Sequence, residues 1–176
     1  MRDEVRQPDR EALEALLARH PADLAGLVLR LAWRQGLSRE EIVSLQWAQV
    51  DFQSGQLSLT DRTLPLDPDT AACLAARYER GGAESPNAVT SDKFRRPLRS
   101  ESASRVARTA LDEAGLTAVQ LKDLRRDFVV RQLAEHDWPH AVRVSGLSVT
   151  TYQTRFAGEA PRRRRPARSA RSFDEF

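Results

Sequence analysis

The residues with the clearest chemical potential form a short run, Leu-Lys-Asp-Leu-Arg-Arg-Asp-Phe, at positions 121–128. Its three cations, Lys122, Arg125 and Arg126, fall in a predicted amphipathic helix. Guanidinium and ammonium groups bind phosphate oxygens through charge-assisted hydrogen bonds. For Arg125, the alternative is a structural ion pair with Asp123, Asp127 or Glu41. The run therefore predicts either a phosphate-binding face or a helix stabilised by ion pairs.

Positive charge is concentrated around this run. The whole chain carries a net charge of +3, but residues 93–131 hold ten Lys or Arg against five acids. Ser100, Ser102 and Ser104 lie among them near a predicted helix start, where they add phosphate donors. An ordinary solvated face is the alternative. We predict double-stranded DNA as the partner, contacted by Arg39, Arg62, Lys93, Arg95, Arg96, Arg105, Lys122, Arg125 and Arg126.

A second basic cluster lies at the C-terminus. Residues 161–176 contain six arginines and two acids, a net +4, so the preceding residues sum to −1. Their Arg, Pro, Ser and Ala composition cannot bury enough apolar area to fold. We therefore predict one domain over residues 1–160 and a disordered Arg-rich tail over residues 161–176. The last five residues carry two aromatics that a free tail does not need.

Three further motifs accompany the run at 121–128. The first is Gln-Gly-Leu-Ser-Arg-Glu-Glu-Ile at 35–42, followed by Leu45, Trp47 and the pair Val50 and Asp51. The second is Arg-Thr-Leu-Pro-Leu at 62–66, and the third is the segment 145–156. Over roughly residues 24–156, these motifs resemble the signature boxes of the tyrosine recombinases of the phage-integrase family. The resemblance implies the catalytic-domain fold of that family, with its second, core-binding domain absent.

In that family a tyrosine attacks a phosphodiester while Arg, His and Lys side chains neutralise charge and supply protons. The resemblance implies that Arg125 alone keeps its expected catalytic place. The replaced positions are Ser38 for the first Arg, Lys122 and Arg126 for two His, Leu147 for the third-box His and Phe156 for the tyrosine. The hairpin lacks the family's Lys, and Arg62 is a poor proton donor. Each lost electrostatic partner commonly costs about 10² to 10³ in rate.

The resemblance therefore implies a catalytically degenerate protein that binds DNA, or a recombinase partner, without cutting DNA. An active recombinase using Arg125 and Tyr152 is the first alternative. A second is a transcription regulator, because residues 35–42 also resemble the turn of a helix-turn-helix. A third is an interaction module with no nucleic-acid role. Family C-terminal segments often dock on a neighbouring protomer, so the tail is expected to contact a second copy or a partner.

The pattern predicts a mainly α, α+β fold with one small antiparallel sheet. Ser38 and Glu41 form a predicted capping box. The expected helices cover residues 10–19, 24–35, 39–47, 68–78, 103–114, 122–135 and 140–145, with a cap at Ser100 or Ser102 for the fifth. The expected strands are 56–60 and 63–66, and residues 81–92 are an expected polar loop.

Composition also leads to predictions about cellular location, metal binding and core residues. No apolar stretch of about 18 residues and no N-terminal apolar region exists, which predicts a cytoplasmic protein without a membrane contact. The three His and the single Cys73 lack metal-ligand spacing, so no metal and no cofactor is expected. Cys73 is predicted to be a small core residue. Trp33, Trp47 and Trp138 are predicted to pack in the core.

Overall fold

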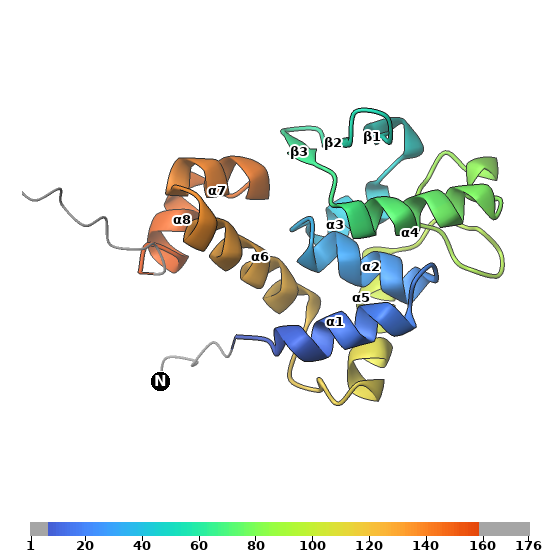
Figure 1. Cartoon of the computed structure of the whole chain (residues 1–176), viewed down its shortest axis with the longest axis horizontal. Coiled ribbons are helices and arrows are strands. Elements are labelled where there is room, and N and C mark those ends of the chain that lie inside the picture. Colours follow the sequence, from blue (N-terminus) through green and yellow to red (C-terminus); the bar gives the residue numbers. More distant parts are fainter. Residues whose placement is uncertain (1–6, 159–176) are drawn as a thin grey trace, which may run out of the picture.

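The computed structural model describes residues 7–158. In that part of the chain, helices make up most of the fold, and one small sheet lies at its edge (Figure 1). The elements are α1 Arg10–Arg19, α2 Leu24–Trp33, α3 Arg39–Ser44, β1 Val50–Asp51, β2 Gln56–Ser58, β3 Thr63–Pro65, α4 Pro68–Glu79, α5 Ser100–Glu113, α6 Leu121–Glu135, α7 Trp138–Ser145 and α8 Val149–Arg155. The predicted mainly helical fold with a small antiparallel sheet is confirmed.

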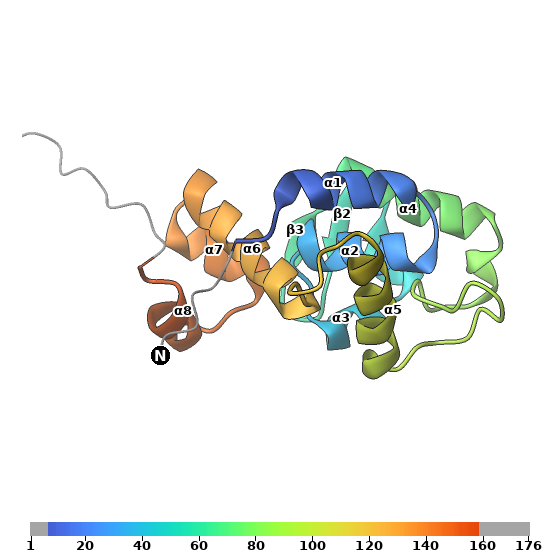
Figure 2. The same ribbon diagram turned by 90° about the horizontal axis from the view of Figure 1, so that it is seen from below.

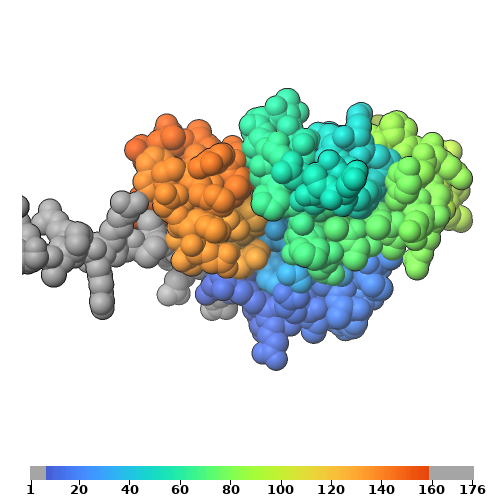
Figure 3. Space-filling model, turned by 45° about the horizontal axis from the view of Figure 1, so that its top comes forward, coloured from blue at the N-terminus to red at the C-terminus, as the bar shows by residue number. Residues whose placement is uncertain are grey.

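Helix α2 forms the centre of the fold. Nine of its ten residues are buried, as a helix that is apolar on all sides requires. Helices α1, α4, α5 and α6 all pack on it. Seen from below, α1 lies on one side of α2 and α3 lies on the opposite side (Figure 2). Helices α6 to α8 form a lobe beside the sheet (Figure 3).

The sheet has the strand order β1-β2-β3, and both pairs are antiparallel. Leu57 of β2 faces Leu64 of β3, and both side chains are buried. Residues on either side of them point to solvent, which gives the two-residue period seen in the sequence. The strands are shorter than the predicted 56–60 and 63–66, because the turn around Asp61 and Arg62 begins at residue 59.

Two predicted helix starts are confirmed. The Asp9 carboxylate accepts from the Ala12 amide at 3.0 Å. Ser38 and Glu41 form the predicted capping box, with both reciprocal bonds present. The cap predicted for α5 is wrong, because Ser100 is already the first helical residue and Arg99 is the cap without a side-chain bond. The backbone itself closes that turn, since the Ser102 amide donates to the Arg99 carbonyl.

Other boundaries also differ from the prediction. The third helix ends at Ser44 rather than at Trp47, because Leu45 adopts an extended conformation and a separate 3₁₀ turn covers Trp47–Gln49. Helix α7 starts before Pro139, a position where the missing proline amide costs no hydrogen bond. The loop 81–92 is less polar than predicted, since its Ala88 and Val89 are buried.

Two of the three tryptophans pack as predicted. Trp33 is buried in the core. Trp47 is half-buried and packs against the core from outside. Trp138 is exposed, so its predicted core position is wrong, and it stacks on Tyr152 instead. Cys73 is buried as predicted, and burial raises the pKa of its thiol.

Two other predictions concern the C-terminal tail and contact with a membrane. The predicted tail, residues 161–176, lies outside the described residues. Among residues 7–158, no helix is both long enough and apolar enough to cross a membrane.

A buried carboxylate joins three helices. Asp127 of α6 is 2% exposed and accepts from the Trp33 indole of α2 at 2.8 Å. The Arg10 guanidinium of α1 donates to both of its oxygens, at 3.0 and 3.2 Å. Arg131, one turn later on α6, lies 3.3 Å away. Because a buried charge is tolerated only when it is paired, these contacts set how α6 lies on α1 and α2.

Asp127→Asn should therefore lower the free energy of unfolding by about 3 kcal/mol, because two arginines lose their buried partner. Urea unfolding at neutral pH measures this loss. Asp112→Asn is the matched control, since Asp112 pairs with Arg108 at an exposed site and should cost at most about 0.5 kcal/mol. Equal losses in the two variants would contradict the assigned role of Asp127.

Candidate functional site

The site is built around an ion pair between Glu41 and Arg62. The Arg62 guanidinium, which is buried in the turn between β2 and β3, donates to the two Glu41 oxygens at 2.7 and 3.1 Å. It also donates to the Val144 carbonyl at 2.9 Å and to Asp61 at 2.8 Å. The turn is thereby attached to α3 and to α7. With these partners, the Arg62 side chain is directed into the protein, and its predicted contact with DNA stays a prediction.

Glu41 has two roles at once. One of its oxygens accepts from the Ser38 amide at 3.0 Å, which completes the capping box of α3. Burial alone would raise the pKa of Glu41, but the hydrogen bonds from Arg62 and from the Ser38 amide outweigh it and lower that pKa. The carboxylate is therefore charged at neutral pH. Ser38, where the family has an arginine, is used as a helix cap.

Arg125 projects from α6 beside this pair. Its Nε donates to the Gly36 carbonyl at 3.1 Å and one Nη donates to the Ser145 carbonyl at 3.0 Å. Burial and the nearby Arg62 lower the pKa of Arg125, although Glu41 acts in the opposite direction. Its hydrogen bonds run to neutral carbonyls rather than to carboxylates. Arg125 is thus held in place while its charge is not matched by a direct ion pair within residues 7–158.

Two clefts flank this part of α6, and Gln120, Lys122 and Arg125 line both. The α3/α5 cleft, about 620 Å³, has its other walls in α3 and α5. Arg39, Arg105 and Arg108 line it, so the structure gathers cations that are far apart in the sequence. The cleft therefore carries five cations, Lys122 and Arg125 included, against a single acid, Glu40, which pairs with Arg39.

The second space is the α8 cleft, about 920 Å³, between α6, α8 and the segment before α6. Arg125, Leu147 and Phe156 line it together. The positions that match the family's third box therefore line the same cleft as Arg125. Arg126 lines the same cleft, and its guanidinium lies 5.3 Å from the Phe156 ring centroid.

Tyr152 does not belong to the lining of the α8 cleft. Its side chain is 7% exposed, and its ring stacks on Trp138 with centroids 5.3 Å apart and planes 14° apart. The ring therefore packs α8 against α7. The α8 residues that do face the cleft are Thr151, Arg155 and, just beyond the helix, Phe156.

The remaining predicted DNA contacts lie on the loop before α5. Lys93 and Arg96 are exposed there, whereas Arg95 lines a separate pocket with Arg77. Sequence analysis missed the Glu41 and Arg62 pair and the cleft position of Arg155. The ion pair could have been suspected, because Glu41 and Arg62 both fall at positions that match the family motifs. Across residues 7–158, no group of three or more His, Cys, Asp or Glu is placed to hold a metal ion.

Comparison with known proteins agrees with this geometry. The model of the phage integrase family matches residues 10–143, and the chain therefore belongs to that family. A search of curated proteins finds no match.

Two solved structures are similar in fold. One is a crystal structure of XerA recombinase, with a TM-score of 0.73 and 18% identity over 82% of this chain and 57% of that one. The other is the integrase from mycobacterium phage Brujita, with a TM-score of 0.63 and 21% identity over 88% of this chain and 56% of that one. The chain thus spans little more than half the length of either protein.

The ion pair makes a pH-dependent prediction. Because the folded pKa of Glu41 is lowered, its contribution to stability is complete above the unfolded pKa of about 4.3 and is lost as pH falls through the folded value. Glu41→Gln should therefore cost about 3 kcal/mol at pH 7 and much less at pH 3. Urea unfolding at the two pH values measures the difference.

Glu40→Gln is the control for this experiment. Glu40 is the exposed neighbour and pairs only with the exposed Arg39 among the ion pairs of the described residues. Its loss should cost at most about 0.5 kcal/mol. A Glu41→Gln cost that is the same at pH 3 and pH 7 would exclude a charge-dependent role for this carboxylate.

Proposed function

We propose that this chain is a recombinase-type domain that binds duplex DNA and holds a phosphate at Arg125 without cutting the strand. Its basic surface around the α3/α5 cleft supports the DNA contact. Arg39, Arg105 and Lys122 lie on three different elements there, as binding to a regularly spaced phosphate backbone requires. The excess of cations over acids in this cleft counts against an interaction module without a nucleic-acid role.

One observation supports the proposal that the strand is not cut. Phe156, and not Tyr152, lines the cleft that contains Arg125. Phosphoryl transfer to the protein needs an oxygen nucleophile within about 3.5 Å of the phosphorus, in line with the leaving oxygen. Phe156 has no oxygen, and Leu147 in the same wall can neither donate nor accept a proton. Arg125 would bind a phosphate in this cleft, but neither of these two neighbours can attack it.

The alternative nucleophile, Tyr152, is poorly placed for the reaction. To reach the α8 cleft, its ring would have to leave the stack on Trp138 and the buried position that it shares with the core. Ser38 cannot supply the missing charge either, because a serine hydroxyl is neutral, and this one accepts from the Glu41 amide at 3.2 Å. Both side chains serve the fold in their present positions.

The helix-turn-helix alternative has less support. Its recognition helix would be α3, which has only six residues. One face of α3 is also occupied, because Ile42 is buried in the core and Glu41 binds Arg62. A helix of fewer than two turns offers few side chains to the major groove.

The proposal predicts that the purified protein forms no covalent adduct with a nicked suicide DNA duplex. The measurement is a denaturing gel with labelled DNA. An adduct that disappears in a Tyr152→Phe variant would overturn the proposal, because it would identify Tyr152 as a working nucleophile. Phe156→Tyr is the variant to compare with Tyr152→Phe, since it places one oxygen in the cleft that contains Arg125.

The DNA contact itself is tested by the salt dependence of binding. Lys122→Ala and Arg105→Ala should each lower the slope of log affinity against log salt by about 0.9, the value for one lost phosphate contact. Fluorescence anisotropy with a labelled duplex measures the slope. Arg19→Ala is the control, since Arg19 is an exposed arginine of α1, on the side of α2 away from α3 (Figure 2). Equal slopes in all three variants would place the DNA elsewhere.

A further inference from the structure

The loop before α5 exposes an aromatic side chain at its tip. Phe94 is 64% exposed, more than any other large apolar side chain among residues 7–158. Lys93 and Arg96 lie beside its ring, with their charged groups 5.1 and 5.6 Å from the ring centroid. An exposed phenylalanine contributes little to folding, because its ring remains in water. Its position between two cations therefore calls for a different explanation.

The tip is a tight turn. Thr90 and Pro97 form an isolated antiparallel bridge. Within it, the Ser91 amide donates to the Arg96 carbonyl at 2.9 Å, and the Arg95 amide donates to the Ser91 carbonyl at 2.9 Å. Arg95 has a φ of 51°, the left-handed conformation that lets the chain reverse. The backbone thus holds Phe94 outward through its own hydrogen bonds.

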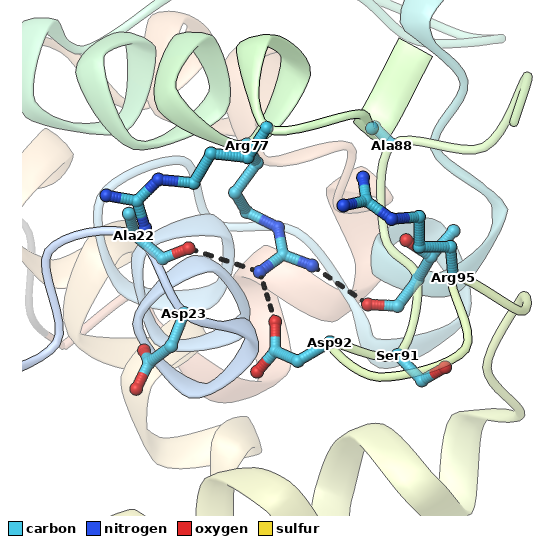
Figure 4. Close-up of a pocket in the computed structure, with 10 residues that line it drawn as sticks. Ala22, Asp23, Arg77, Ala88, Ser91, Asp92 and Arg95 are labelled. Carbon is cyan, nitrogen blue, oxygen red and sulfur yellow. Dashed lines mark hydrogen bonds and ion pairs between the residues drawn. The ribbon is translucent and has the colours of Figure 1, made fainter. Parts of the chain in front are cut away.

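The base of the loop is anchored to the body of the protein by Arg77 (Figure 4). Arg77 of α4 donates to Asp92 at 2.7 Å, to the Thr90 carbonyl at 2.9 Å and to the Ala22 carbonyl at 3.2 Å. The second Asp92 oxygen accepts from the Leu24 amide at the start of α2, at 3.2 Å. The loop is thereby joined to both α2 and α4.

The three cations of the tip, Lys93, Arg95 and Arg96, have two different orientations. Arg95 points inward, with its guanidinium over Gly81, where an added Cβ would lie only 2.4 Å from Nη1. Gly81 has a φ of 94°, a left-handed conformation that favours glycine. Lys93 and Arg96 remain outward beside Phe94. The single acid of the tip, Asp92, is already bound by Arg77, so the exposed tip is positively charged.

We propose that this tip is a second DNA contact, in which Phe94 enters the minor groove of a duplex while Lys93 and Arg96 bind the phosphates on either side. The minor groove is about 6 Å wide, and apolar side chains flanked by cations are known to enter it. The loop leads directly into α5, whose Arg105 lines the α3/α5 cleft. The same duplex can therefore reach both places. This inference rests on the proposed DNA-binding function.

The test is Phe94→Ala in the full chain, measured by fluorescence anisotropy with a labelled 30-base-pair duplex. Affinity should fall about tenfold, while the salt slope stays unchanged because phenylalanine carries no charge. Phe52→Ala is the matched control, since Phe52 is 43% exposed in the turn after β1, and it should bind like the unmodified chain. Phe94→Trp should retain affinity. The urea midpoint should stay the same in all variants.

The possible results distinguish failure of the proposed DNA-binding function from failure of the proposed role of Phe94. If the unmodified chain fails to bind the duplex, both the proposed function and this inference are overturned. If it binds and Phe94→Ala binds equally well, only the role of Phe94 is overturned. If Phe94→Ala keeps its DNA affinity but loses binding to phosphatidylserine vesicles, the tip contacts an anionic membrane surface instead. A tenfold loss on DNA with no vesicle binding supports the proposal.

Discussion

The site depends on one ion pair, that of Glu41 with Arg62. A buried ion pair contributes little net stability, because both ions lose hydration, but its geometry is specific. Here the Arg62 guanidinium reaches α3 through Glu41 and α7 through the Val144 carbonyl. Gly146 permits this approach, since a Cβ there would lie 2.4 Å from Arg62 Nη1. Three segments distant in sequence are thereby brought to where Arg125 meets the Ser145 carbonyl.

Local rules of sequence accounted for the order of the helices and for several of their caps, although not for that of α5. The capping box at Ser38 depends on residues three apart, and the caps at Asp9 and Asp23 depend on a carboxylate next to free amides. These features follow from a few neighbouring residues. Element order and the family resemblance could therefore be predicted from the amino-acid sequence alone.

The contacts that define the site could not be predicted in the same way. Arg62 and Val144 are separated by 82 positions, and no local pattern indicates that they meet. Trp138 appeared to be a core residue from its apolar surroundings, yet it lies on the surface and covers Tyr152. The sequence spacing also left Tyr152 as a candidate nucleophile, and only the three-dimensional packing separates it from the cleft that Phe156 lines.

Ser38 has a clear local role at a position that the family resemblance aligns with a catalytic arginine. A serine there closes the first turn of α3, with its hydroxyl 3.2 Å from the Glu41 amide. Arginine cannot accept a hydrogen bond, so it cannot perform that task. Glu41, the capping-box partner of Ser38, also binds Arg62. The cap of α3 and the ion pair of the site therefore share one carboxylate.

The attachment of α6 has a mechanical consequence. Arg125 and Asp127 are two residues apart, so on a helix they project about 200° from one another. One is bound to the Gly36 and Ser145 carbonyls, and the other to Arg10 and Trp33. Because α6 is held on two nearly opposite sides, its rotation about its own axis is restricted. The face of α6 that carries Lys122 is therefore fixed relative to α1 and α2.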